Sequence, residues 1–288
     1  MDNQSRVYEK RNQNKNGRLS YGWNHGCRSD NCVCVGINMR IAIVTGASSG
    51  IGEEFCRRLD AEGYDCIWLI ARREEQLKKV SDGLQTPSKI INCNLTNRVD
   101  LEKLKLIIET ERPDVKMLVC CAGVGYFGTV TDVDYDEQHS MIDLNVSALV
   151  DTISFTVPYM SAGSSIIVLC SLSAYIPMPY MAVYSSTKAF VRHYCNSIRE
   201  ELRPKQIGVL EVSPGWVDTG FIDNCRDDSV PDKVFNGMCT VENVVDQALK
   251  DLSRKRKRSR VGVRTKFRSF MGLHFNTIVT KIWMKYWK

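Results

Sequence analysis

The chain of 288 residues is 43% hydrophobic and 25% charged, a globular composition sufficient for one large α/β domain. Its longest apolar runs, such as SIIVLC at 165–170, are strand-sized and far below the ~18 apolar residues of a membrane-spanning helix. The net charge of +6 is local, because residues 254–288 hold 12 of the 39 basic residues and no acidic one, which leaves 27 basic against 33 acidic elsewhere. This distribution excludes a general affinity for nucleic acid.

Residues 1–38 are rich in Asn, Arg, Lys, Gly and Ser and have few apolar positions, so we predict a disordered leader. A second interpretation is that Met39, directly before the first predicted strand, is the true start and that the leader is not translated. One cluster in the leader has metal-ligating residue types but lacks the paired Cys-x-x-Cys spacing of a zinc site, so we predict no metal. The cluster consists of His25, Cys27, Cys32 and Cys34.

The 12 cysteines are scattered through apparent strands and helices, a pattern typical of buried, reduced thiols. No signal peptide is recognised, so we expect a cytoplasmic protein.

From Arg40 onward, short apolar runs alternate with helix-length periodic segments. Continuous apolar strands separated by helices indicate a parallel sheet covered on both faces. We therefore predict a single α/β domain over 39–263, a doubly wound Rossmann-type fold whose ligands bind beyond the carboxyl ends of the strands. The predicted strands are RIAIVT (40–45), CIWLIA (66–71), KIINCN (89–94), KMLVCC (116–121), SIIVLC (165–170), IGVLEV (207–212) and a short one at SRVGV (259–263).

The first predicted strand runs directly into TGASSGIG at 45–52. Its glycines permit a tight turn and a close approach of backbone to a diphosphate, and the following predicted helix offers free N–H groups at its N-terminus. The spacing Gly-x-x-x-Gly-x-Gly differs from the longer dinucleotide fingerprint, but its place between strand and helix supports the same use. The predicted cofactor contacts in this loop are Gly46, Ser48, Ser49, Gly50, Ile51 and Gly52.

The second predicted strand ends in ARREEQL. An acidic residue here would bind the ribose 2′-hydroxyl of NAD, whereas an arginine accommodates a 2′-phosphate. Arg72, helped by Arg73 and Ser48, therefore predicts NADP(H), with NAD(H) less favoured. The alternative is an arginine solvated at the start of a helix.

Residues 184–188 read YSSTK at the predicted start of a helix. Positions i and i+4 share one helix face, so Tyr184 and Lys188 can point into one site. An ammonium near a phenol favours the phenolate and lowers a pKa that is ordinarily near 10. The pair is therefore a candidate acid, although the same spacing in isolation usually marks a solvated helix face.

Over residues 39–250 the chain resembles the short-chain dehydrogenase/reductase family. The motifs occur in the family's order, and Ser171 lies thirteen residues before Tyr184, the family's usual separation. They are TGASSGIG at 45, CAG at 121, Asn145 in LNV, Ser171 in LCSLSAY, YSSTK at 184 and PGWVDT at 214.

The resemblance implies four catalytic residues. Tyr184 would be the general acid when a ketone is reduced, and Lys188 would lower the pKa of Tyr184 and hold the nicotinamide ribose. Ser171 would hydrogen-bond the substrate oxygen, and Asn145 would support a water that relays protons to Lys188. Donors aimed at the carbonyl oxygen act mainly on the transition state, where negative charge develops. The alternatives are that Ser171 only caps a strand end and that Asn145 only hydrogen-bonds backbone.

The resemblance also implies further cofactor contacts and shows two departures from the family pattern. The usual Asn-Asn-Ala-Gly is CCAG here, so Cys120 and Cys121 supply no side-chain amides. The usual Asp after the third strand is Asn94, whose carbonyl oxygen we expect to reach the adenine amino group. The expected contacts are Asn94, Leu95, Ala122, Gly123, Pro214, Gly215, Val217 and Thr219, besides Tyr184 and Lys188.

By analogy with similar enzymes, the rim of the substrate pocket is expected at AYIPMPYM (174–181) and at 221–238. Apolar side chains there suit a hydrophobic ketone or aldehyde. We expect Phe127, Tyr175, Met178 and Tyr180 among them.

The chain ends in a basic tail, residues 264–288, without the Val-Asp-Gly-Gly-like segment that many family members use in tetramer packing. Apolar residues at three- and four-residue spacing with lysines between them suit an amphipathic helix on an anionic membrane surface. We favour the alternative, a helix packed on the protein's own substrate pocket or on a second subunit.

These observations predict a cytoplasmic NADP(H)-dependent carbonyl reductase or alcohol dehydrogenase that acts on a small, hydrophobic molecule, forms a homo-oligomer and binds no nucleic acid. One alternative is a non-catalytic NADP(H)-binding regulator with the same fold. Another is a peripherally membrane-associated reductase of lipid or steroid ketones.

Overall fold

The computed structural model describes residues 12–13, 19–20, 39–225 and 230–287. The chain divides into two compact units, Met1–Cys34 and Val35–Lys288. In the first unit, β1 (Asn12–Gln13) pairs antiparallel with β2 (Leu19–Ser20). The remainder of the predicted leader, including its His and Cys cluster, lies outside the described residues.

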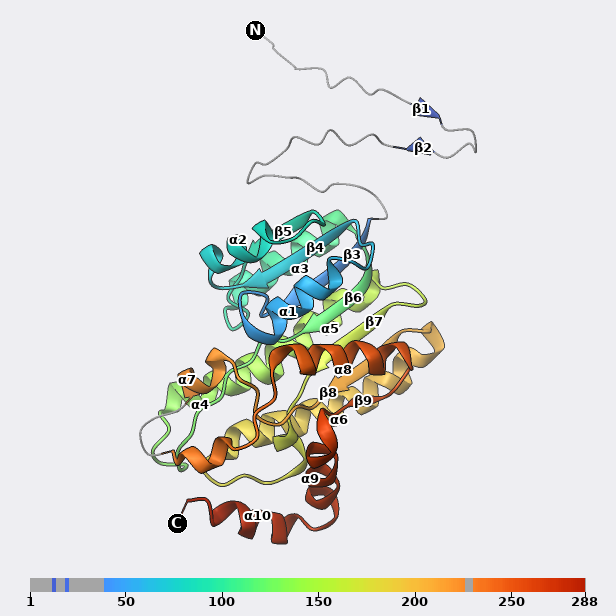
Figure 1. Ribbon diagram of the computed structural model, residues 1–288. Coiled ribbons are helices and arrows are strands. Elements are labelled where there is room, and N and C mark those ends of the chain that lie inside the picture. Colours follow the sequence, from blue (N-terminus) through green and yellow to red (C-terminus); the bar gives the residue numbers. More distant parts are fainter. Residues whose placement is uncertain (1–11, 14–18, 21–38, 226–229, 288) are drawn as a thin grey trace. The chain divides into compact units, whose positions relative to one another are not determined.

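The second unit is built on a seven-stranded parallel sheet, which confirms the predicted fold class (Figure 1). The strand order is β5-β4-β3-β6-β7-β8-β9, so the sheet extends from β3 first to one edge and then from β6 to the other. This reversal beside β3 is where a doubly wound sheet opens its ligand crevice. The strands are β3 (Arg40–Thr45), β4 (Cys66–Ala71), β5 (Ser88–Asn92), β6 (Asp114–Cys120), β7 (Ser165–Leu169), β8 (Gly208–Val212) and β9 (Arg258–Ser259).

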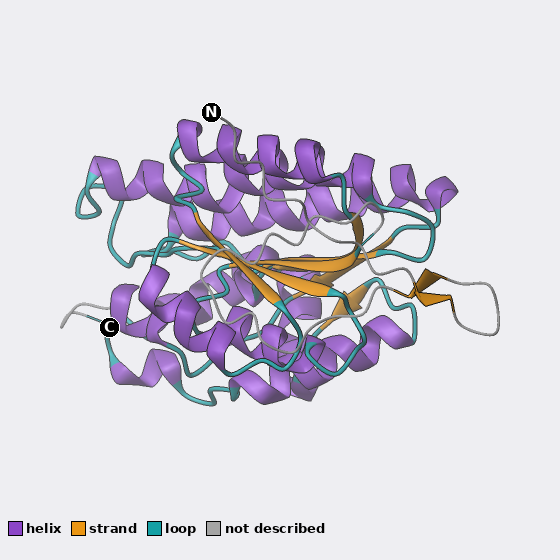
Figure 2. Cartoon of the chain, turned by 90° about the horizontal axis from the view of Figure 1, so that it is seen from above, coloured by secondary structure: helices purple, strands orange, loops and turns teal. Residues whose placement is uncertain are grey.

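Helices cover both faces of this sheet (Figure 2). Alternate residues of the strands, such as Val44 and Leu69, form one core cluster with apolar residues of α1, α2 and α8. The intervening residues, such as Ile43 and Trp68, are equally buried and face the opposite layer. The helices are α1 (Gly50–Leu59), α2 (Glu74–Asp82), α3 (Arg98–Glu111), α4 (Tyr135–Ile142), α5 (Ala148–Thr156), α6 (Ala182–Leu202), α7 (Gly220–Cys225), α8 (Val241–Ser253), α9 (Gly262–His274) and α10 (Asn276–Met284).

The last predicted strand is only partly confirmed. β9 pairs with β8 at two positions, Glu211 with Arg258 and Val212 with Ser259, and α9 begins at Gly262. After Val212 the chain leaves the sheet, so a longer β9 would have no backbone partner for its N–H and C=O groups.

The predicted basic tail is helical and lies within the second unit, where α10 contacts the segment 174–181. In α10 the indole Nε1 of Trp283 donates a hydrogen bond of 2.8 Å to the carbonyl of Pro179. Trp287 stacks on Tyr180, with ring centroids 4.0 Å apart. In the part of the chain that the structure describes, no helix is both long and apolar enough to cross a bilayer.

Candidate active site

The Tyr and Lys of YSSTK lie on the inward face of α6. The buried residues of this helix recur at helical spacing, and Tyr184 and Lys188 occupy the first two turns of the same stripe. Tyr184 is 7% exposed and Lys188 is 4% exposed, which excludes the solvated-face interpretation of the motif. The stripe continues through Val191, Cys195, Ile198 and Leu202.

The ammonium of Lys188 is held at the end of β7. Its Nζ donates a hydrogen bond of 3.0 Å to the carbonyl of Leu169, two residues before Ser171, and lies 5.7 Å from the ring centroid of Tyr184. Burial lowers the pKa of Lys188, because a charged amine loses hydration in the protein interior. A Cβ on Gly123 would come within 3.5 Å of this nitrogen. A side chain at this position would therefore crowd the amine.

Asn145 lies in η1 (Asp143–Ser147), a single π-helical turn between α4 and α5. Such turns occur mostly as insertions within α-helices and frequently at functional sites. The side chain of Asn145 forms a reciprocal pair of hydrogen bonds with the backbone of Val124, accepting from its N–H at 2.9 Å and donating to its carbonyl at 2.8 Å. It also donates to the hydroxyl of Thr187. The side chain therefore positions the segment after β6 beside α6.

Ser171 lies two residues after the end of β7 and caps η3 (Leu172–Tyr175), a short 3-10 helix. Its Oγ accepts a hydrogen bond of 3.2 Å from the N–H of Ser173. This cap uses an acceptor site of the hydroxyl and orients the side chain, while the hydroxyl proton remains a donor. Capping and substrate binding are therefore compatible roles for this serine.

The glycine-rich loop forms a tight turn. Gly46 and Gly50 have φ values of 68° and 56°, in the left-handed region that favours glycine. A Cβ on Gly46 would lie 2.8 Å from the backbone nitrogen of Ala122, and one on Gly52 would lie 2.2 Å from the carbonyl oxygen of Gly46. The loop is thus closed tightly between β3, β6 and the N-terminus of α1, where backbone N–H groups favour an anion.

Of the two arginines after β4, Arg73 reaches the glycine-rich loop. Its guanidinium donates to the hydroxyls of Ser48 and Ser49, at 3.2 and 2.7 Å. The side chain of Arg72 is exposed, and the backbone carbonyl of Arg72 accepts a hydrogen bond from the side-chain amide of Asn92. The sequence placed the greater weight on Arg72, whereas the geometry places Arg73 over the two serines.

The residues expected near the adenosine lie at the carboxyl ends of β5 and β6. Leu95 and Ala122 line one small hollow, together with Thr45 and residues of α5. The side-chain oxygen of Asn94 accepts hydrogen bonds from the backbone N–H and the hydroxyl of Thr96, and so stabilises the turn in which Asn94 lies. Its contact with the adenine amino group stays a prediction.

The loop after β8 completes the same edge of the sheet. The carbonyl of Pro214 accepts a hydrogen bond from the N–H of Leu172, which joins this loop to the one that carries Ser171. A Cβ on Gly50 would lie 3.2 Å from the methyl of Thr219, so the loop also closes over the glycine-rich turn. Val217 is buried, and Gly215 faces Thr265 of α9.

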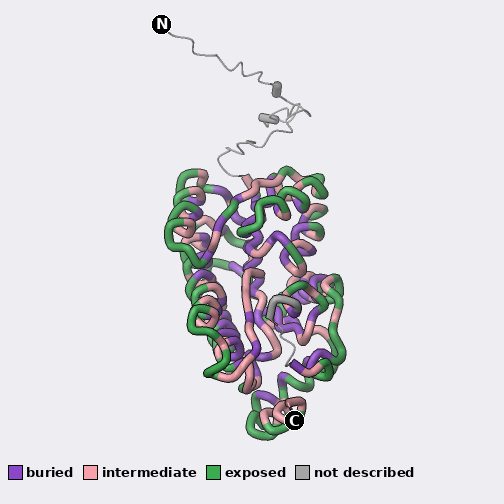
Figure 3. The backbone as a smooth tube through the Cα atoms, turned by 90° about the vertical axis from the view of Figure 1, so that its left-hand side faces the viewer, coloured by how far each residue is buried: buried purple, intermediate pink, exposed green. Residues whose placement is uncertain are grey.

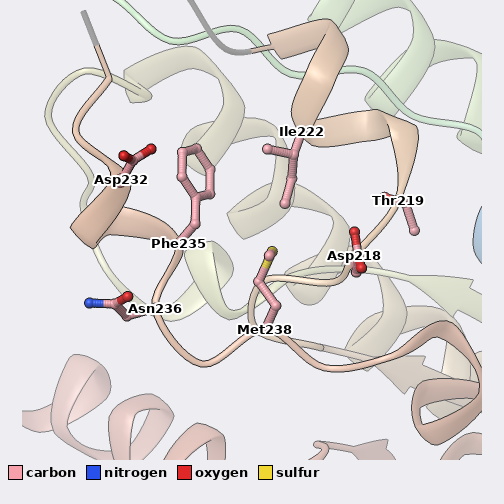
Figure 4. Close-up of a pocket in the computed structure, with 7 residues that line it drawn as sticks. All are labelled: Asp218, Thr219, Ile222, Asp232, Phe235, Asn236 and Met238. Carbon is pink, nitrogen blue, oxygen red and sulfur yellow. The ribbon is translucent and has the colours of Figure 1, made fainter.

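A pocket of ≈ 310 Å³ adjoins this loop (Figure 4). Its residues come from the segment after β8 and from the predicted substrate rim, of which 226–229 lie outside the described residues. The pocket is lined by Asp218, Thr219, Ile222, Asp232, Phe235, Asn236 and Met238.

An aromatic cluster surrounds Tyr184, and sequence reasoning found only part of it. Phe127 and Met178, as predicted, pack here with Trp216 and Phe221. The ring of Phe221 lies 5.7 Å from that of Tyr184, and a Cβ on Gly125 would meet both rings at 2.8–2.9 Å. The sequence analysis did not identify Gly125, although it lies two residues after the CAG motif. Nor did it name Trp283 and Trp287, through which α10 joins this cluster.

The prediction that Tyr175 lines the substrate rim is wrong. This side chain is buried, and its hydroxyl donates a hydrogen bond of 2.6 Å to Glu211 of β8. Burial and the neighbouring carboxylate raise the pKa of Tyr175. Glu211 is fully buried and also accepts from Ser213, with Arg258 of β9 as its ion-pair partner at 3.4 Å. The cluster connects η3 to the sheet edge.

Residues 40–229 match the family model of the short chain dehydrogenases. The chain belongs to the short-chain dehydrogenase family. It is 31% identical over 185 residues to an uncharacterized oxidoreductase of Staphylococcus epidermidis, a match that covers 64% of this chain and 80% of the relative. Membership makes this short-chain dehydrogenase an NAD(P)-dependent oxidoreductase.

Two solved structures share its fold. A short-chain dehydrogenase from Sphingobium yanoikuyae in complex with NADPH has a TM-score of 0.69 at 23% identity, covering 83% of this chain and 95% of that chain. A short chain dehydrogenase/reductase from Burkholderia phymatum in complex with NAD has a TM-score of 0.71 at 19% identity, covering 82% and 93%. These similarities confirm the Rossmann-type architecture of this short-chain dehydrogenase.

Proposed function

We propose that this enzyme transfers hydride between NADP(H) and a hydrophobic ketone or aldehyde, or the corresponding alcohol. The observation that carries the proposal is the burial of Tyr184 and Lys188 on one stripe of α6, directly beside Gly123 and the end of β7. This arrangement brings a phenol, an ammonium and the Ser171 loop to the carboxyl edge of the sheet, where the glycine-rich loop also lies.

Each side chain has a definite task in the proposed reduction. The bound nicotinamide supplies the hydride that the carbonyl carbon accepts. Tyr184 donates its proton to the carbonyl oxygen, so that C=O becomes CH–OH. Lys188, as an ammonium, stabilises the phenolate that remains. Ser171 donates a hydrogen bond to the same oxygen as its negative charge develops. Asn145 keeps the segment that contains Gly123 and Val124 against α6.

The proposed preference for NADP(H) is supported by Arg73. A guanidinium that already hydrogen-bonds Ser48 and Ser49 is placed to bind a phosphate together with both hydroxyls. The solved structures of similar fold contain NADPH in one case and NAD in another, so the preference is a property to be measured on this chain.

We propose an apolar substrate because the side chains around Tyr184 are apolar. The ring of Phe221 lies 5.7 Å from that of Tyr184, and Phe127, Trp216 and Met178 belong to the same apolar cluster. A hydrophobic carbonyl compound would bury its surface against these rings without leaving a polar group unpaired.

Two further predictions remain proposals. Core cysteines such as Cys56, Cys120 and Cys170 are buried free thiols, which supports a reducing, cytoplasmic location. A homo-oligomer is also expected, and light scattering of the purified protein measures it.

The test is oxidation of NADPH and NADH against ketosteroids, aldehydes, 3-ketoacyl thioesters and small diketones. We expect turnover with NADPH that falls by about 10²- to 10⁴-fold in Tyr184→Phe, the usual contribution of a general acid, with NADPH binding unchanged. Tyr194→Phe, the same change on the same helix, serves as the control and should retain full activity. Tight NADPH binding without turnover across the panel would contradict the proposal and favour a regulator.

A further inference from the structure

The helix α9 buries its small and polar face and exposes its large apolar face. Its buried residues are small or polar, Thr265, Ser269 and Gly272, at i, i+4 and i+7. Its large apolar residues face solvent: Phe267 is 62% exposed and Phe270 is 53% exposed. The two sets lie about half a turn apart around the helix. A surface helix ordinarily turns its apolar stripe towards the core, whereas the outward stripe of α9 stays exposed. The ring of Phe270 lies 4.6 Å from that of His274, which belongs to the same helix.

The outward apolar stripe continues along the chain into α10. Leu273 and Phe275, at the joint between the two helices, are exposed, as are Ile278 and Ile282 of α10. The tube in Figure 3 is accordingly coloured mainly as exposed and intermediate where it approaches the C-terminus. We define the outer face of the tail as Val263, Phe267, Phe270, Leu273, Phe275, Ile278 and Ile282.

Basic side chains border this outer face. Arg264 and Lys266 are exposed and flank the stripe of α9 on its two sides, and Lys281 and Lys285 are exposed on the side of Ile278 and Ile282. No acidic residue occurs anywhere from Arg254 to the end of the chain. The outer face therefore combines an apolar stripe with a positive border.

We propose that the outer face of the tail docks on a lipid bilayer that carries anionic headgroups. Apolar side chains of α9 and α10 would enter the boundary between headgroups and acyl chains, and the bordering lysines and arginines would contact lipid phosphates. This arrangement removes exposed rings from water and uses every basic residue of the border.

The charge pattern selects this partner over the alternatives. Two copies of the chain joined face to face by a two-fold axis would bring the same basic residues together, and like charges across an interface are unfavourable. A nucleic acid offers phosphates but no apolar surface for Phe267 and Phe270. An anionic bilayer offers both.

Docking would place the proposed substrate site next to the membrane. The inner side of the same helices contacts the rim of that site, through Trp283 on Pro179 and Trp287 on Tyr180. If the proposed reductase function holds, its substrates are therefore carbonyl compounds dissolved in the bilayer, such as long-chain aldehydes or ketones. The docking surface itself does not depend on that function.

The direct test is co-sedimentation of the full chain with phosphatidylcholine vesicles, with and without phosphatidylglycerol. We expect binding only to the anionic vesicles, weakened by added salt. Phe267→Ser/Phe270→Ser should weaken binding about tenfold per ring lost from the lipid boundary. The control Val130→Ser removes an equally exposed apolar residue far along the chain, between β6 and α4, and should bind as the wild type does.

A second pair of variants isolates the charge. Lys281→Glu/Lys285→Glu should weaken binding at least about 25-fold, because each lysine at an anionic surface contributes about fivefold. Lys103→Glu/Lys105→Glu, the same reversal on exposed positions of α3, is the control. Equal binding to neutral and anionic vesicles, or equal binding by wild type and both tail variants, would overturn the proposal.

Light scattering and turnover distinguish the remaining outcomes. A wild-type oligomer that dissociates in Phe267→Ser/Phe270→Ser would show that a second copy covers the outer face, and would refute membrane docking. With a short, water-soluble carbonyl compound, this variant should turn over at the wild-type rate, whereas its rate with a vesicle-dissolved long-chain aldehyde should fall. Absence of turnover with any substrate would refute the proposed function alone, since sedimentation decides the docking surface independently.

Discussion

The contact between α9 and η3 can be tested at a single atom. Gly272 lies against the loop that follows the proposed catalytic serine, and a Cβ there would be 2.4 Å from the carbonyl oxygen of Tyr175 and 2.6 Å from Ile176. Ordinary contact begins near 3.4 Å, so Gly272→Ala requires α9 or η3 to move by about 1 Å. A backbone carbonyl cannot rotate away as the end of a flexible side chain can.

The magnitude follows from two opposing effects. Overpacking of this kind costs about 1–3 kcal/mol, whereas Ala stabilises a helix interior by up to about 1 kcal/mol relative to Gly. The net loss is about 1–2 kcal/mol, which in a domain of this size lowers Tm by about 2–8 °C. A displacement of about 1 Å beside Ser171 is also enough to lower kcat by up to about 100-fold.

Thermal unfolding, NADPH binding and turnover of Gly272→Ala are the measurements. Gly220→Ala is the control, because among the described residues a Cβ there would meet no atom within 4 Å outside its chain neighbours and its own helix backbone. We expect Gly272→Ala to retain NADPH binding, since the atoms nearest the added Cβ belong to Tyr175 and Ile176 and not to the glycine-rich loop, but to melt earlier and turn over more slowly. A variant as stable and as active as Gly220→Ala would refute the packing of α9 on η3.

Three further predictions concern charged residues. Arg73→Ala should raise the KM for NADPH about 10- to 100-fold and leave that for NADH nearly unchanged, since hydrogen bonds to a charged group contribute about 1.5–3 kcal/mol. An equal rise for both cofactors, or an NADPH-selective rise in Arg72→Ala instead, would contradict this assignment. Lys188→Met should be inactive, and denaturant unfolding should show its gain in stability over wild type shrinking as the pH rises towards 10.5, the ordinary pKa of lysine. The reason is that burial lowers the pKa of Lys188, so the unfolded chain binds its proton more tightly and the residue's contribution to stability rises with pH from the folded pKa towards the unfolded one; a pH-independent difference would exclude it. Glu211→Ala should lower the free energy of unfolding by about 3–5 kcal/mol, because it leaves Arg258 and the Tyr175 hydroxyl without their buried partner. The control Glu200→Ala removes an exposed carboxylate and should lower it by at most about 0.5 kcal/mol. Similar unfolding midpoints of the two variants would be incompatible with this cluster.

The fold and the centre of the site were readable in the sequence because their signals are local. Continuous apolar runs separated by helical periodicity can be satisfied only by a sheet buried on both faces. The glycines of TGASSGIG and the i, i+4 spacing of Tyr184 and Lys188 likewise encode geometry within a few residues. The order of these elements along the chain then places them at one edge of a doubly wound sheet.

Contacts between distant segments needed the tertiary structure. Whether Arg72 or Arg73 reaches Ser48 depends on how the backbone leaves β4, and two adjacent arginines give no sequence signal to separate them. Tyr175 looks like a rim residue by its position, yet Glu211 of β8 draws its hydroxyl into a buried cluster. A one-dimensional pattern does not record such a pairing.

The tail shows the same division most clearly. Its sequence by itself determined that it is helical, amphipathic and basic, because periodicity and charge are properties of the chain alone. Only the tertiary structure decided which side faces inward. Thr265, Ser269 and Gly272 allow α9 to approach Gly215 and Tyr175 closely, a fit that larger side chains would prevent, so Phe267 and Phe270 are left outside. The physical reason is steric, because only the face of α9 with the smallest side chains can pack closely against the rest of the protein.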